Sequence, residues 1–289
     1  MCMRQTLSTQ FFPDISIVIP TLGGDCLRDT IKTINSGTLI PKEILVCIPS
    51  SHGSSVDFLK SIANVQIVLT LEKGQVFQRS EGFKLATSEI VIQLDDDIQL
   101  EANAIRLLIE ELLLLGPGNV VGPLLVDRGS LNPMHKIKEG LAGFIDNLFF
   151  TLVCGAKWGK ERMGTITAAG IGFGVAPLSF DPKVIQCDWL PGGCVVSYRK
   201  ELIFHNFYPF SGKAFYEDFI HSHLRSKNNK KHWVIGAAIG ATDRAFRIQD
   251  KESFHKNRMA RRYYVNLRGF SRSRLFLYET VELLKFFLF

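Results

Sequence analysis

The sequence predicts an α/β fold whose sheet is mostly parallel in the first half of the chain. Short runs of aliphatic, often β-branched residues alternate there with segments of helical character, and this alternation gives right-handed βαβ crossovers. The 289 residues are 46% apolar and 21% charged, which supports a large core and excludes a disordered chain. The predicted strands cover residues 15–20, 43–48, 65–69 and 90–94.

Capping and turn residues place the helices between these strands. Asp25 is positioned to cap a helix that ends before Gly37, and Pro49 with the serines after it stops the second strand. A fifth strand within GPGNVVGPLLVD closes a nucleotide-binding half over about residues 14–126, although no GxGxxG fingerprint surrounds Gly23. The expected helices cover residues 25–35, 55–63, 74–87 and 101–115.

The second half is predicted to be a mixed α/β half over about residues 127–250, which completes a catalytic domain of residues 1–250. We interpret the glycine-rich residues 128–182 as an excursion over a substrate cleft, because long loops in compact domains are usually functional. Its apolar piece, residues 144–153, leaves contact with a membrane as an alternative. Beyond it the sequence predicts a strand from Val184, a Pro-Gly-Gly turn, a second strand, a helix from Arg199, a helix over 215–225, a strand over 232–239 and a helical tail over 251–289.

Three consecutive carboxylates end the strand that begins at Ile90. Asp95, Asp96 and Asp97 repel one another, so they indicate a bound cation at the carboxyl end of the sheet, where ligands of α/β proteins gather. Alternate residues of an extended chain point the same way, so we expect Asp95 and Asp97 to face one side together. Oxygen ligands suit Mg²⁺ or Mn²⁺ shared with substrate phosphates. The alternative is an acidic turn that only caps the next helix.

Cysteine usage and hydropathy bear on the compartment. The six cysteines form no CxxC pair, so a zinc site is not indicated. The first residues contain no apolar run of signal-peptide length, and no window has the length and apolarity of a membrane span. These features predict a reduced, cytoplasmic protein.

The basic residues are concentrated near the C-terminus. The chain has 34 Lys and Arg against 28 Asp and Glu, and the stretch 251–274 holds eight of the former against Glu252 alone, which argues against a general nucleic-acid surface. An amphipathic segment, LFLYETVELLKFFLF, follows. Basic residues before an aromatic amphipathic helix suit the surface of an anionic membrane. The alternative is that this helix packs on the catalytic domain or on a second subunit of a homo-oligomer.

Several motifs, taken together and in order, resemble the family 2 glycosyltransferases of bacterial cell-surface polysaccharide synthesis. These are inverting enzymes with the GT-A fold and nucleotide-sugar donors. SIVIPTLGG resembles the family's first strand and donor loop, and QRSEGFKLATSEIVIQLDDD resembles its helix and acidic strand. WLPGGCVVSYRKELI resembles the acceptor-side segment, FYEDFIHSHLR the Glu-Asp motif, and RRYYVNLRGFSRSR the region near the end of the catalytic domain. The matches run from Ile15 to about Arg274.

The resemblance implies an enzyme that moves a sugar from a nucleotide-diphosphate donor to a hydroxyl of a glycan, which we expect to be lipid-linked and at the cytoplasmic face of a membrane. It implies Mn²⁺ or Mg²⁺ as cofactor, with Asp97 as ligand and Asp95 as a ligand or a ribose contact. It implies Asp218 as the base that deprotonates the acceptor, with Glu217 as the other candidate. Alternatively, both carboxylates only start a helix. The remaining implied positions are Pro20, Thr21, Arg79 and Asp96 on the donor side, and Trp189, Gly192, Gly193 and Arg225 on the acceptor side.

Two departures from the family pattern leave roles open. The second strand ends without the acidic residue that reads the nucleobase in many members, so Ser50 or His52 takes that place. The histidine found near the metal in many members is also missing, which leaves Asp243, His255 or no third protein ligand. For Arg79, the alternative to donor binding is a surface ion pair with Glu72 or Glu81.

Two other functions compete with glycosyl transfer. A sugar-phosphate nucleotidyltransferase shares the architecture, but it needs a Gly-rich phosphate loop with a Lys or Arg, and PTLGGD is a poor version of one. A non-catalytic glycosyltransferase-like membrane scaffold is the other candidate, and the intact acidic motifs argue against it.

Overall fold

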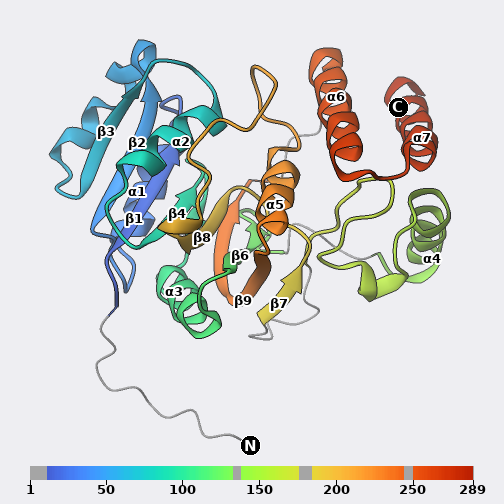
Figure 1. Cartoon of the computed structure of the whole chain (residues 1–289), viewed down its shortest axis with the longest axis horizontal. Helices are drawn as coiled ribbons and strands as arrows, with labels where there is room; N and C mark the ends of the chain where they lie inside the picture. Colours follow the sequence, from blue (N-terminus) through green and yellow to red (C-terminus); the bar gives the residue numbers. More distant parts are fainter. Residues whose placement is uncertain (1–11, 133–137, 176–183, 244–249, 289) are drawn as a thin grey trace, which may run out of the picture.

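The computed structural model describes residues 12–132, 138–175, 184–243 and 250–288. Within these residues, nine strands form one sheet in the order β3-β2-β1-β4-β8-β6-β9-β5, and β7 pairs with β9 (Figure 1). The strands are β1 (Ile15–Pro20), β2 (Glu43–Pro49), β3 (Val65–Thr70), β4 (Ile90–Leu94), β5 (Gln99–Leu100), β6 (Asn119–Asp127), β7 (Val184–Cys187), β8 (Cys194–Tyr198) and β9 (Lys231–Thr242). The helices are α1 (Cys26–Asn35), α2 (Gln75–Leu85), α3 (Ala104–Leu115), α4 (Gly140–Phe149), α5 (Glu217–Lys227), α6 (Lys251–Arg268) and α7 (Arg272–Leu288).

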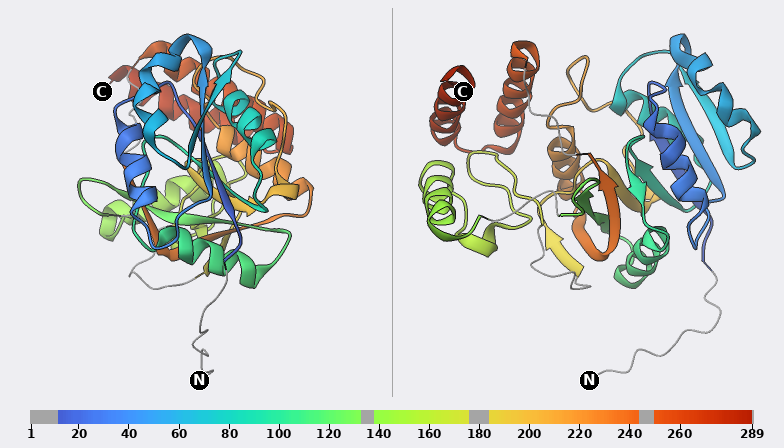
Figure 2. Two further views of the ribbon diagram at one scale, coloured as in Figure 1. Left: turned by 90° about the vertical axis from the view of Figure 1, so that its left-hand side faces the viewer. Right: turned by 180° about the vertical axis from the view of Figure 1, so that it is seen from behind.

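The nucleotide-binding half is the parallel part of the sheet, β3-β2-β1-β4, as the sequence predicts. Every residue of β1 and β4 is buried, because helices cover both faces of these strands. Ile15, Ile17 and Ile19 pack into the core under α1 and α3, while Val18 faces α2 on the opposite side. Figure 2 shows the two helical layers edge on.

The second half is mixed, which confirms the predicted fold class. β8 runs antiparallel between β4 and β6, and it joins the parallel half to the pair of parallel strands β6 and β9. Three local predictions differ in part from the structure. The helix expected from Arg199 is only a 3₁₀ turn, Arg199–Glu201, because Leu202 is drawn into the core beneath α2. The helix expected over 55–63 is a 3₁₀ helix, Ser50–Ser61, and the Asp25 side chain makes no capping hydrogen bond.

The excursion after β6 divides into two parts within its described residues. α4 continues into a π-helical turn, Phe150–Cys154, and both lie beside α7 at the far end of the molecule from β3 (Figure 1). The segment around Gly172 instead reaches the acceptor side, where a Cβ atom at Gly172 would lie 2.2 Å from the Phe219 ring. Only this second part lies near the predicted site.

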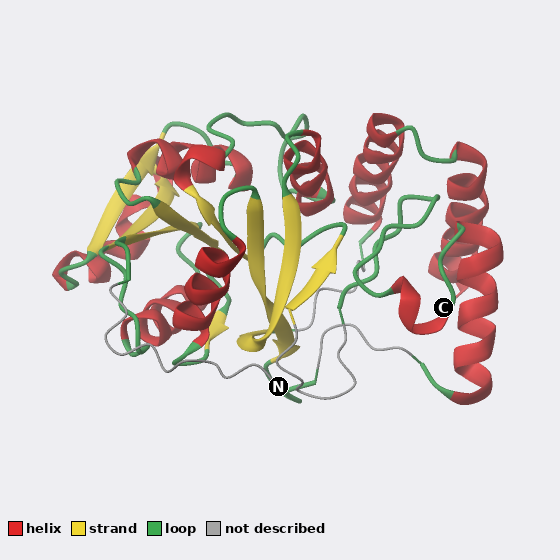
Figure 3. Ribbon diagram, turned by 60° about the horizontal axis from the view of Figure 1, so that its bottom comes forward, coloured by secondary structure: helices red, strands yellow, loops and turns green. Residues whose placement is uncertain are grey.

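The C-terminal helices pack on the rest of the chain, which is one of the two predicted alternatives for the tail. Tyr264 of α6 is fully buried in a cluster with Val76, Tyr208 and Ile220. α7 contacts α6 and the π-helical turn, as Figure 3 also shows. None of the described helices combines the length and the apolarity needed to cross a bilayer.

Candidate active site

The carboxyl ends of β1, β2 and β4 form one rigid edge. Gln78 of α2 donates to the backbone oxygens of Thr21 and Cys47, both at 2.7 Å, and so ties the ends of β1 and β2 together. The Thr21 hydroxyl donates to the Asp96 carboxylate, and Thr30 of α1 donates to the Asp96 backbone oxygen at 2.8 Å. Pro20 is buried at the end of β1. The donor-side residues predicted at this edge are therefore brought together.

The three carboxylates have different surroundings. β4 ends at Leu94, so strand alternation alone does not set their orientation, and a shared direction of Asp95 and Asp97 stays a prediction. Asp95 turns toward α2, where its Oδ1 accepts from Gln75 at 2.9 Å and from Arg79 at 3.0 Å. Burial raises the pKa of Asp95 to about 6, against the opposing charge of Arg79. Asp97 is exposed, and no described residue donates to its carboxylate.

Arg79 joins the two halves of the site. Its side chain is 2% exposed, and it binds Asp95 at the strand end and Glu217 of α5, at 3.0 and 2.7 Å. The predicted alternative of a surface pair with Glu72 or Glu81 is wrong, because α2 turns this residue toward the sheet; Glu81 pairs with Lys84 instead. A residue of the predicted donor side thus holds one of the two predicted catalytic carboxylates.

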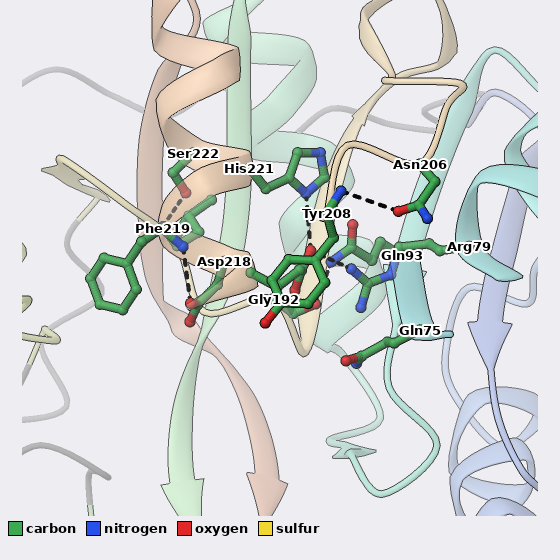
Figure 4. Close-up of polar contacts among 12 residues, drawn as sticks. Gln75, Arg79, Gln93, Gly192, Asn206, Tyr208, Asp218, Phe219, His221 and Ser222 are labelled. Atoms are coloured by element: carbon green, nitrogen blue, oxygen red, sulfur yellow. Dashed lines mark hydrogen bonds and ion pairs between the residues drawn. The ribbon is translucent and has the colours of Figure 1, made fainter. Parts of the chain in front are cut away.

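The neighbouring carboxylates Glu217 and Asp218 have opposite electrostatic environments. Burial raises the pKa of Glu217, but Arg79, His221 and Arg225 outweigh it and lower that pKa to about 2. Burial and the charge of Glu217 raise the pKa of Asp218 to about 7. Asp218 accepts from the backbone N–H of Phe219, at 2.9 Å. Figure 4 shows Asp218 and His221 on α5, with Gln75 and Arg79 on the opposite side of the site.

The turn that presents these two residues is strained. Tyr216, directly before α5, has φ 59° and ψ 12°, a left-handed conformation that costs about 1–3 kcal/mol in a non-glycine residue. Its ring stacks on Phe219 at 4.8 Å and lies under the Arg261 guanidinium at 5.6 Å. The Tyr208 hydroxyl donates to the Phe215 backbone oxygen at 2.8 Å. These contacts stabilise the turn and so fix the position of Glu217 and Asp218 at the start of α5.

The acceptor-side residues line the other wall, with one exception. Trp189 stacks on Phe219 at 4.2 Å. A Cβ atom at Gly192 would lie 2.8 Å from the Glu217 carboxylate, and one at Gly193 would lie 2.5 Å from Ile98, so both positions need glycine. Arg225 does not reach this wall, because its side chain is buried beneath α5 near Glu217.

The remaining predicted residues follow β2 or β9, or lie on α6. Asp243 is exposed and lies near the end of β4, because Arg128, 3.7 Å from its carboxylate, also donates to the Asp97 backbone oxygen at 2.6 Å. His255 is exposed on α6. Ser50 donates to the Thr70 backbone oxygen at 3.2 Å, and His52 contacts Ser51. Across the described ranges, no group of three His, Cys, Asp or Glu side chains is arranged to hold an ion.

Sequence reasoning missed several residues that shape the site. Gln75 could have been predicted from the sequence, because it lies one helical turn before Arg79 and therefore on the same face of α2. Gln93 interrupts an apolar strand, and its amide donates to the Gly192 backbone oxygen. Tyr208 and Arg261 carried no local signal, because their partners lie in other elements of the fold.

The carboxylates at the end of β4 fit a hard divalent cation. Among the described residues, none donates to the exposed Asp97 carboxylate, and the hydrogen bonds to the Asp95 carboxylate go to its Oδ1, so oxygen atoms of both side chains are available. Two carboxylates suit Mg²⁺ or Mn²⁺, which keep several waters and share the remaining positions with substrate phosphates.

Comparisons with known proteins bear on the family and the fold of the chain. The sequence model of the family described as "Glycosyl transferase family 2" matches residues 16–172, more than half of the chain. A search of curated proteins found no match to the chain.

Solved structures share the fold at low sequence identity. A crystal structure of GalNAc-T7 with UDP, GalNAc and Mn²⁺ matches 81% of this chain at 14% identity and a TM-score of 0.61. Residues 1–349 of TarS from S. aureus match 87% of the chain at 12% identity and 0.50. The mannosyltransferase PcManGT from Pyrobaculum calidifontis, in complex with GDP-Man and Mn²⁺, matches 89% at 13% identity and 0.50. This chain covers 44%, 65% and 63% of their respective lengths.

Proposed function

We propose a function from one premise: this chain belongs to glycosyl transferase family 2, as its match to the family's sequence model shows. In this proposal it moves a sugar from a nucleotide-diphosphate donor to an acceptor hydroxyl, with inversion at the anomeric carbon. The observation that carries the proposal is the double ion pair of Arg79. By holding Asp95 at 3.0 Å and Glu217 at 2.7 Å, it fixes the donor edge against the helix that bears Asp218.

The donor binds at the strand ends in this proposal. Thr21 and Asp96 contact the nucleotide, and Arg79 sets the position of Asp95 beside it. Asp95 and Asp97 hold Mn²⁺ or Mg²⁺, which, when bound, neutralises the negative charge that develops on the diphosphate leaving group. Two structural neighbours that contain Mn²⁺, one with UDP and one with GDP-Man, support this assignment.

Asp218 acts as the general base. A carboxylate with a pKa of about 7 is half ionised near neutral pH and accepts a proton more readily than an ordinary aspartate. It takes the proton of the acceptor hydroxyl while that oxygen attacks from the side opposite the leaving group, which inverts the configuration. Glu217 is unsuited to this step, because Arg79 keeps it ionised and paired.

The acceptor is a glycan in this proposal. Tyr216 and Phe219, whose rings are partly exposed, stack on each other beside Asp218, and aromatic faces suit the apolar faces of sugar rings. We extend the proposal to a lipid-linked glycan of cell-surface polysaccharide synthesis, reached at the cytoplasmic face of a membrane with a contribution from the C-terminal helices. The apolar side chains of α7 that lie beside α4 support this extension.

A binding screen followed by a product analysis tests the proposal. The melting temperature is measured with a panel of nucleoside diphosphates and Mn²⁺, because a ligand that binds the native state raises it. The matching nucleotide-sugars are then tested for hydrolysis, and the anomeric configuration of the first released sugar is read by NMR. One nucleotide should stabilise the protein and its sugar should be released with inversion. Release with retention, or no stabilisation by any nucleotide, would overturn the proposal.

A further inference from the structure

The outer side of α4 is an apolar surface with no covering element among the described residues. Its side chains recur at helical spacing, so they lie on one face, and they are 41–76% exposed. Trp158, 46% exposed, packs edge-on against one of them at 5.8 Å between ring centroids. We call this surface the α4 face; it consists of Leu141, Phe144, Ile145, Leu148, Leu152 and Trp158.

The charge pattern of α4 is the reverse of that in an ordinary surface helix, whose polar side faces water. The helix contains one charged residue, Asp146, and this carboxylate is paired with Arg162 at 2.7 Å and Lys138 at 3.3 Å. The outward face therefore carries no charge of its own. A contiguous apolar patch of this kind marks an interaction site.

Lysines surround the α4 face. Lys157 and Lys160 are exposed on either side of Trp158, and Lys138 is exposed before the helix begins. The exposed acidic residues beside them in sequence are Glu139 and Glu161. The local excess of positive charge complements an anionic surface.

A groove beside the face has the same character. It lies between α4 and α7, has a volume of about 730 Å³, and is walled mainly by apolar side chains that include Ile145, Phe149 and Val281. Two lysines, Lys138 and Lys285, and two acidic residues, Asp146 and Glu282, also line it. Figure 1 shows α4 directly below α7 at this end of the molecule.

We propose that the α4 face docks on a membrane that contains anionic phospholipids. The apolar side chains enter the acyl region, the lysines lie at the phosphates, and the groove takes an acyl chain. A protruding apolar helix with basic residues beside it suits a lipid surface. It suits a second copy of this chain poorly, because a two-fold contact would bring lysines of the two copies together.

This inference deepens the proposed function, because it names the surface that brings the site to a lipid-linked acceptor. It also revises the prediction for the tail. Three arginines of α6 are engaged by α7, Arg258 and Arg262 with Glu279 and Arg261 with Glu282, so these three are not free to bind lipid. The lipid-facing element is therefore α4, and α7 contributes one wall of the groove.

Vesicle flotation with point variants tests the inference. The full chain is mixed with vesicles of phosphatidylcholine, with or without phosphatidylglycerol, at low and high salt. We expect binding to the anionic vesicles, and binding about 100-fold weaker for Phe144→Glu combined with Leu148→Glu. Lys157→Glu combined with Lys160→Glu should weaken binding about tenfold at low salt and less at high salt.

The matched control places glutamates on apolar residues that are equally exposed but belong to other elements. Leu71→Glu combined with Leu114→Glu, at positions 96% and 77% exposed, should bind vesicles like the unchanged protein. Melting temperature and hydrolysis of the soluble donor should be unchanged in all variants, which separates this inference from the proposed function. The inference fails if the unchanged protein does not float, if the α4 variant floats equally well, or if that variant only converts a dimer to a monomer.

Discussion

The donor edge and the acceptor side of the site are built in different ways. The donor edge is held mainly by hydrogen bonds that involve the backbone. β1 and β4 pair in parallel register, and the Gln78 side chain donates to backbone oxygens at the strand ends. The acceptor side is held by side chains from distant elements, such as the Arg261–Glu282 ion pair and the rings around Tyr216. Loss of one exposed charge at the donor edge should therefore leave the free energy of unfolding almost unchanged. Loss of one buried charge on the acceptor side should lower it.

Metal removal should have the largest effect on activity and little on stability. Chelation with EDTA, or Asp97→Ala, should abolish transfer and donor hydrolysis, because the diphosphate loses its counter-charge. The melting temperature of the D97A protein without ligand should stay near that of the unchanged protein, since this carboxylate is exposed and accepts no hydrogen bond from a described residue. Turnover measured with and without added Mn²⁺ checks this, and near-normal turnover in EDTA would contradict it.

Arg79→Met should break the link between the two regions. It leaves Asp95 and Glu217 without their shared counter-charge, and loss of one partner of a buried ion pair costs about 3–5 kcal/mol. Urea denaturation measures the free energy of unfolding. Arg106→Met is the matched control, because Arg106 pairs with Glu110 at 2.6 Å on a partly exposed helix face and its loss should cost less than about 1 kcal/mol. Equal costs for the two variants would refute a joining role for Arg79.

Glu282→Gln should damage the acceptor side alone. The substitution removes the charge that binds Arg261, whose side chain is 3% exposed and lies over the Tyr216 ring. Loss of a hydrogen bond to a charged group costs about 1.5–3 kcal/mol, and we expect a raised acceptor KM with an unchanged nucleotide Kd. Glu252→Gln, at an exposed pair with Lys256, is the control and should change neither. A nucleotide Kd that weakens as much as the acceptor KM would show that the two regions are not separable.

The sequence predicted the donor edge better than the acceptor side for a physical reason. A strand buried on both faces, such as Ile90–Leu94, shows its environment in its own residues, so four parallel strands were recognised. The directions of Asp95 and Asp97 were not predictable from strand alternation, because β4 ends before them. The pairing of Arg79 with Glu217 joins positions 138 residues apart, and no local pattern reports such a contact.

The tail shows the same limit. The sequence predicted that its basic residues bind an anionic membrane, because their partners, Glu279 and Glu282, lie on the next helix and could not be recognised. Likewise, nothing local in the sequence around Tyr264 indicates that α6 enters the core beside α5. The apolar piece around Phe144 was noticed, but whether it covered the cleft or faced outward depended on where the fold placed it.

The opposite environments of Glu217 and Asp218 set their expected roles. The folded pKa of Asp218, about 7, lies above its ordinary value of 3.8, so its carboxyl contributes stability in acid that is lost as pH rises toward 7. Asp218→Asn removes that unfavourable charge, so at pH 8 the variant should unfold no more easily than the unchanged protein. Glu217→Gln should instead lower the free energy of unfolding, because Arg79 loses a charged partner.

The pH dependence of kcat/KM, measured for the unchanged protein and for Asp218→Asn, tests the account most directly. For the unchanged protein, kcat/KM should rise with pH through about 7 and then level, as Asp218 loses its proton. Asp218→Asn should lack this rise and be slower by about 10²–10⁴-fold, with an unchanged nucleotide Kd. A D218N protein that keeps its rate and its rising limb would contradict the assignment of Asp218 as the base.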